Sequence, residues 1–220
     1  MTEKRPSGLS PAKLVGFAVL AGLVVGAAAV YVNLALSGNG EQTASAAQCQ
    51  ASMAEAEALA PFSRGDVAAM VPVTAPRLIE GLSFQDADGK PVTMADFRDQ
   101  TVLLNLWATW CVPCREEMPA LNNLQEALGS DDFKVLAINI DTGDVEKPRS
   151  FLEEIGVDSL GLYRDASMGV FNKLKKDGLA FGLPVTLLID EQGCLLSAMN
   201  GPAVWDGADA KALIAAAVTP

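Results

Sequence analysis

The chain has 220 residues, a formal net charge of −11 and no histidine. A strongly acidic chain repels nucleic-acid phosphates, so nucleic-acid binding is excluded as an expected function. The absence of histidine excludes Ser-His-Asp and Cys-His catalysis, imidazole zinc sites and histidine haem ligation. Half of the residues are hydrophobic, which is enough for a folded core.

Residues 14–36 form an apolar segment without a single charge. A helix needs about 20 apolar residues to cross a bilayer, so this segment predicts an N-terminal transmembrane helix. Basic residues precede the segment, and the next one after it is Arg64. The positive-inside rule then makes residues 1–13 a cytoplasmic tail and places the rest of the chain in the periplasm, anchored in the inner membrane by a single pass.

A cleaved signal peptide is the alternative for this segment, because Ala44, Ser45 and Ala46 resemble a cleavage site. The apolar region of a signal peptide is usually about 7–15 residues long, shorter than residues 14–36. The residues before Cys49 do not form a lipobox. An uncleaved anchor is therefore the preferred interpretation.

The next segments predict a linker and an extra N-terminal helix. Residues 37–47 are rich in Gly, Ser and Ala and are typical of a linker. Residues 48–76 form an N-terminal helical extension, in which Cys49, Met53, Ala56 and Ala60 recur at helical spacing. The extension continues as an irregular bridge that contains two prolines.

Residues 77–220 alternate between strand and helix patterns. A hairpin is expected at 82–92, strands at 101–106, 133–140, 185–190 and 194–199, and helices after residue 111, at 145–155, at 167–174 and at 206–218. This alternation predicts an α/β fold with helices on both faces of a sheet.

The motif Trp110-Cys111-Val112-Pro113-Cys114 lies where a buried strand leads into a helix. Unpaired backbone N–H groups and the helix dipole stabilise a thiolate at such a position. Cys111 is therefore the expected nucleophile, and Cys114, one turn later, the expected resolving thiol. Pro113 suits an early helical position, where its missing N–H costs nothing.

Three other interpretations of the cysteine pair have less support. A zinc or iron–sulfur site needs two further ligands, whereas Cys49 and Cys194 are single and distant. A copper clip of two thiolates would have no histidine to complete it. A purely structural Cys111–Cys114 bridge would close too short a loop to stabilise much.

The string LLNLWATWCVPCREEMPALNNL resembles the active-site region of the thioredoxin superfamily. It is most similar to the membrane-anchored TlpA/ResA/CcmG branch, and within it to TlpA. The resemblance covers residues 77–218 and implies a thioredoxin fold, a central mixed β-sheet flanked by helices. It also implies that Pro184 in Gly-Leu-Pro-Val-Thr is cis and faces the disulfide, so that Trp110, Pro113, Leu183 and Pro184 line a substrate groove.

Glu117 matches a glutamate near the cysteine pair of ResA-like proteins, which implies a role in proton transfer. A solvated glutamate in the first turn of the helix is the alternative. Soluble thioredoxins carry a buried Asp where this chain has Asn105. Because Asn cannot take a proton from Cys114, that role would pass to Glu117, to water or to the substrate. Trp107 and Met118 could line the groove or lie in the core.

Cys49 and Cys194 remain once Cys111 and Cys114 are paired. Outside the inner membrane an unpaired thiol is a liability, so we expect a structural Cys49–Cys194 disulfide. Two buried free thiols are the alternative.

The expected function is that of a periplasmic thiol–disulfide oxidoreductase whose only redox centre is its cysteine pair, with no bound cofactor and no metal. The resemblance implies a reductase of apoprotein cysteines that later bind a metal centre. These substrates are a copper chaperone, a cytochrome oxidase subunit or apocytochrome c, and a CcdA- or DsbD-like protein supplies the electrons. The alternatives are a dithiol oxidase or isomerase, and a non-catalytic module that binds thiols or copper.

Overall fold

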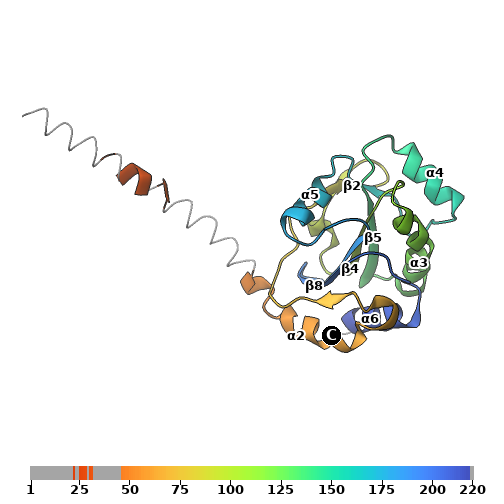
Figure 1. The fold of residues 1–220 in the computed structure, drawn as a ribbon, viewed down its shortest axis with the longest axis horizontal. Coiled ribbons are helices and arrows are strands. Elements are labelled where there is room, and N and C mark those ends of the chain that lie inside the picture. The colour runs from red at the N-terminus through yellow and green to blue at the C-terminus, as the bar shows by residue number, and fades with distance from the viewer. Residues whose placement is uncertain (1–21, 23–24, 29, 32–45, 219–220) are drawn as a thin grey trace, which may run out of the picture. The chain divides into compact units, whose positions relative to one another are not determined.

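The computed structural model describes residues 22, 25–28, 30–31 and 46–218 (Figure 1). The described residues between 22 and 31 are helical. Most of the predicted transmembrane segment, together with the cytoplasmic tail and nearly all of the linker, lies outside the described residues. Within the residues that are described, no helix combines the length and the apolar character needed to cross a membrane.

The domain is built on one mixed sheet of eight strands in the order β1-β8-β7-β4-β5-β6-β2-β3. The strands are β1 (Val71–Pro72), β2 (Ser83–Gln85), β3 (Pro91–Thr93), β4 (Thr101–Trp107), β5 (Phe133–Asn139), β6 (Tyr163–Arg164), β7 (Val185–Ile189) and β8 (Leu195–Asn200). β4 and β5 are parallel, as are β5 and β6, and all other pairs are antiparallel. The predicted α/β fold with a central mixed sheet is confirmed.

Five α-helices accompany the sheet in the described domain. They are α2 (Ser52–Ala58), α3 (Val112–Leu128), α4 (Glu146–Glu154), α5 (Gly169–Lys176) and α6 (Ala208–Val218), with short 3₁₀ helices at Ala60–Phe62, Gly65–Val67 and Met94–Phe97. The crossovers β4–α3–β5 and β5–α4–β6 run in the same direction along the sheet, which places α3 and α4 on one face. Figure 1 shows α5 on the opposite side of the strands.

The central strands have no polar face because both faces of the sheet are covered. Every residue of β4 and of β7 is buried, which explains their continuous apolar sequence. Asn105 and Thr186 are the polar exceptions at the centre, and they lie opposite each other in the β4–β7 register. Polar groups at this depth require internal hydrogen bonds, and the site below supplies them.

The N-terminal extension differs in detail from its prediction. Cys49 lies in a turn before α2, and the buried stripe consists of Cys49, Ser52, Ala56 and Leu59, whereas Ala60 is exposed. Val71 and Pro72 form an edge strand that pairs with β8. Two residues are too few to give a periodic signal, so the sequence predicts an irregular bridge where the structure has a short strand.

Cys49 and Cys194 form a disulfide, the pairing that we predicted. It joins the extension to the residue that precedes β8, and α2 packs against β8. Close by, Ser52 donates a hydrogen bond to the buried carboxylate of Asp190, which also accepts from the backbone N–H of Cys194. The extension is therefore part of the folded domain.

Replacing Cys49 and Cys194 by Ser should lower the free energy of unfolding of the full-length chain by about 2–4 kcal/mol, because the bond closes a loop with a sequence separation of 145. Urea unfolding of the oxidised protein measures this loss. The control is Cys111→Ser/Cys114→Ser, whose bond spans a separation of only 3 and should matter less. Equal losses in the two double variants would contradict a structural role specific to Cys49–Cys194.

Candidate active site

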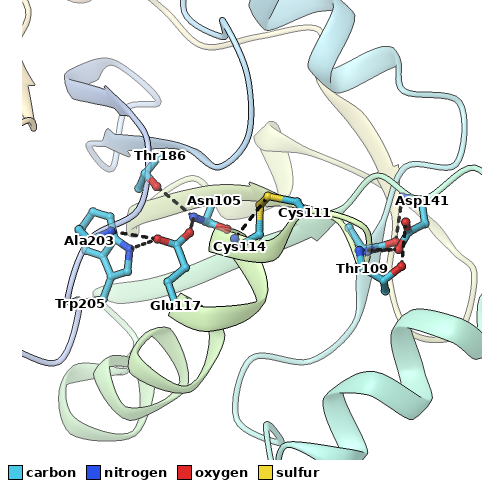
Figure 2. Close-up of a disulfide and its surroundings, with 10 residues drawn as sticks. Asn105, Thr109, Cys111, Cys114, Glu117, Asp141, Thr186, Ala203 and Trp205 are labelled. Carbon is cyan, nitrogen blue, oxygen red and sulfur yellow. Dashed lines mark hydrogen bonds between the residues drawn. A yellow bond between two sulfur atoms is a disulfide. The ribbon is translucent and has the colours of Figure 1, made fainter.

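The Cys111–Cys114 disulfide lies at the N-terminus of α3 (Figure 2). Cys111 is the N-cap residue in an extended conformation, and its sulfur accepts a hydrogen bond of 3.3 Å from the backbone N–H of Cys114. Pro113 occupies the first turn, where an N–H would have no helical partner. A Cys111 thiolate would thus face free N–H groups and the positive end of the helix dipole.

The two sulfur-bearing residues differ in accessibility. Cys111 is 6% exposed and Cys114 is completely buried. An incoming disulfide or thiol can therefore reach only Cys111, as the predicted division between nucleophile and resolving thiol requires. The assignment of these roles stays a prediction.

The predicted groove residues differ in their exposure to solvent. Trp110 is 59% exposed, Pro113 and Leu183 are half-buried and Pro184 is buried. The Leu183–Pro184 peptide bond is cis. Trp107 and Met118, which could have lined the groove, are both in the core.

Glu117 lies one turn after Cys114 on the buried face of α3, with only 3% of its surface exposed. Its Oε1 accepts a hydrogen bond of 2.8 Å from Asn105 Nδ2. Its Oε2 accepts two bonds of 3.1 Å, from the backbone N–H of Ala203 and from Trp205 Nε1. A solvated Glu117, the alternative from the sequence, is therefore wrong.

Burial raises the pKa of Glu117 to about 7, although the hydrogen bonds from Asn105, Ala203 and Trp205 act in the opposite direction. A carboxyl with this pKa can hold or release a proton near neutral pH. Figure 2 shows its carboxylate between Trp205 and Asn105, on the same side of Asn105 as Trp205. The site thus contains a buried acid–base group next to the resolving cysteine.

A second polar cluster holds the loop that precedes Cys111. Asp141, at the end of β5, accepts hydrogen bonds from the backbone N–H of Thr109 at 3.1 Å and from its hydroxyl at 3.2 Å. Asn139 Nδ2 also donates to Asp141, at 2.9 Å. This cluster fixes the turn that leaves Trp110 exposed beside the disulfide.

Sequence reasoning missed several contributors to the site. Ala203, Trp205 and Asp141 do not stand out in the sequence, and Thr186 appears there only as the end of the Gly-Leu-Pro-Val-Thr motif, because hydrogen bonds between distant segments leave no periodic signal. Trp205 gives a weak sequence signal, because it is a large aromatic residue in a loop that contains Gly and Pro. Among the residues that the structure describes, no three Cys, Asp or Glu side chains are grouped so that they could share a metal ion.

The fold and the site define a thioredoxin-like thiol–disulfide oxidoreductase. The chain belongs to the Redoxin family, whose family model matches residues 67–214. It is 32% identical to the thiol-disulfide oxidoreductase ResA of Geobacillus thermodenitrificans over 145 residues, which are 64% of this chain and 75% of ResA. It is 36% identical to the thiol:disulfide interchange protein HelX of Rhodobacter capsulatus over 118 residues, which are 53% of this chain and 61% of HelX.

The fold is similar to that of a solved structure described as a thiol:disulfide interchange protein DsbE from Chlorobium tepidum. The TM-score is 0.53 at 26% sequence identity, and the match covers 64% of this chain and 99% of that one. The predicted membership of the thioredoxin superfamily branch that includes ResA is confirmed.

The raised pKa of Glu117 predicts a specific pH dependence of stability. Between the ordinary value of 4.5 and about 7, the folded state retains a proton that the unfolded state has lost, so stability falls as pH rises through this window. We compare the free energy of unfolding of the unaltered chain with that of Glu117→Gln. The difference between the two should fall by about 3 kcal/mol from pH 4 to pH 8. Urea unfolding at several pH values measures it, and a constant difference would contradict the raised pKa.

Proposed function

We propose that the chain is a membrane-anchored periplasmic reductase of cysteines in metal-centre apoproteins. The observation that carries the redox role is the disulfide at the N-terminus of α3, with Cys111 reachable and Cys114 buried. The reductive direction and the substrates rest on the resemblance to the TlpA/ResA/CcmG branch. The proposed substrates are the copper proteins of cytochrome oxidase assembly or apocytochrome c.

The reaction is an exchange of two electrons and two protons. Cys111 releases its proton to solvent, and its thiolate attacks a sulfur of the substrate disulfide. The first substrate sulfur leaves as a thiolate that takes up a proton from solvent, and a mixed disulfide forms. Cys114 then attacks Cys111, and the second substrate sulfur leaves as a thiolate that takes up a proton. Glu117 accepts the proton that Cys114 loses, so the products are a substrate dithiol and the Cys111–Cys114 disulfide.

Exposed apolar side chains of the domain support a protein as the substrate. Within residues 46–218, the exposed large hydrophobic side chains are Val71, Trp110, Val112, Phe181 and Val204. Trp110 and Val112 flank Cys111, Phe181 precedes the cis-proline segment, and Val204 lies next to a donor to Glu117. A groove of about 400 Å³ connects Phe181 with Val71. Exposed apolar side chains of this kind suit the binding of an apolar polypeptide segment.

The location and the electron donor complete the proposal. Two disulfides in one domain are typical of an oxidising compartment such as the periplasm. The apolar residues 14–36 would anchor the domain to the inner membrane. A membrane thiol carrier of the CcdA or DsbD kind would reduce Cys111–Cys114 after each turnover, and no bound cofactor is needed.

Replacing Cys114 by Ser should trap the mixed disulfide with the substrate, because Cys111 still attacks but nothing resolves the product. Incubation of the reduced variant with an oxidised copper-chaperone apoprotein, followed by non-reducing electrophoresis, should show one covalent adduct. Cys111→Ser is the matched control and should form none. An adduct with Cys111→Ser, or none with either variant, would contradict the proposed attack.

The exposed side chain of Phe181 should contribute to substrate binding and not to sulfur chemistry. Phe181→Ser should raise the KM for a protein disulfide by about tenfold, since removal of an exposed anchor costs about 1 kcal/mol or more. The rate with a small aromatic disulfide should stay unchanged. Steady-state kinetics with both substrates make the test, and an equal loss with the small disulfide would contradict a docking role.

A further inference from the structure

Asn105, in the centre of β4, has a buried oxygen without a partner. The residue is completely buried. Its Nδ2 donates to Glu117 Oε1 at 2.8 Å and to Thr186 Oγ1 at 3.0 Å, so both amide hydrogens are used. Its Oδ1 accepts no hydrogen bond. Buried acceptors rarely lack a donor in folded proteins, so this oxygen requires a physical explanation.

The partners of the amide determine which way the oxygen faces. An ionised Glu117 can only accept hydrogen bonds, so the nitrogen of Asn105 must face it. The oxygen then faces away from Glu117. Figure 2 shows Asn105 between Glu117 and the disulfide, with Cys114 on the side away from Thr186. Cys114 and Glu117 are also three residues apart on the same face of α3.

The structure contains the oxidised site, in which Cys114 has no hydrogen to donate. Reduction of the disulfide adds two electrons and two protons and creates an S–H group on a residue that no water reaches. We propose that Asn105 is a positioning residue whose Oδ1 accepts the S–H of Cys114 in the reduced protein. This inference rests on the proposed function, in which the pair cycles between the disulfide and the dithiol.

The bond would assign different protonation states to the two cysteines. A hydrogen bond from the S–H group stabilises Cys114 as a neutral thiol, while the N-terminus of α3 stabilises Cys111 as a thiolate. The same amide holds the Glu117 carboxylate, which takes the Cys114 proton when that sulfur attacks the mixed disulfide. Asn105 therefore connects the group that loses the proton to the group that receives it.

Carbon-13 NMR of the unaltered full-length chain tests the contact without any substitution. Accepting a hydrogen bond moves a carbonyl carbon downfield, so the Cγ of Asn105 should shift downfield when dithiothreitol reduces the site. Asn139 is the internal control, because its Oδ1 and Nδ2 are already bonded to Asp141. No shift at Asn105, or an equal shift at Asn139, would overturn the proposal.

Infrared spectroscopy of Cys111→Ser provides a second test, since Cys114 is its only thiol while Cys49–Cys194 is intact. The S–H stretching band should lie at lower frequency in this variant than in Cys111→Ser/Asn105→Leu. The control Cys111→Ser/Thr186→Val removes a partner of Nδ2 and keeps the oxygen, so it should keep the low frequency. Equal frequencies with and without Asn105 would overturn the proposal, and if the Asn105→Leu variant does not fold, the NMR comparison decides.

Neither measurement involves substrate turnover. A reductase assay that fails would leave the S–H contact standing, and a missing contact would leave the proposed function standing.

Discussion

The buried carboxylate of Glu117 needs hydrogen-bond donors from the surrounding fold. A carboxylate removed from water is costly unless donors replace its hydration, and here they come from β4 and from the loop before α6. Through Asn105 and Thr186 the same network reaches β7, directly after the cis-proline segment. The helix α3, with the cysteine pair at its N-terminus, is thereby linked to β4, to β7 and to the loop before α6.

This arrangement separates the two thiols by environment. Cys111 is reachable from solvent and lies at the positive end of a helix, which favours the thiolate. Cys114 is completely buried, three residues before Glu117 in α3, where a charge is disfavoured unless a proton acceptor is near. A carboxyl with a pKa of about 7 is matched to that task, because it can take a proton during resolution and lose it again at neutral pH.

Local signals in the sequence predicted most of the fold. The apolar runs of β4, β5 and β7 and the strand-to-helix position of the cysteine motif appear in the structure as predicted. The strands β1 and β6 escaped prediction because two residues each carry no periodicity. The environment of Glu117 could not be derived either, since its burial depends on Trp205, which is 88 residues away along the chain. A glutamate in the first turns of a helix has the same local signature whether water or a tryptophan covers it.

The central claim, a reductase built on Cys111 and Cys114, is tested most directly by the reduction potential of that pair. The full-length chain would be equilibrated with glutathione or dithiothreitol buffers of known ratio, and the reduced fraction of Cys111–Cys114 determined. We predict a potential near that of thioredoxin, about −270 mV. A value near about −120 mV, that of the oxidant DsbA, would mean that the site donates disulfides and would contradict the account.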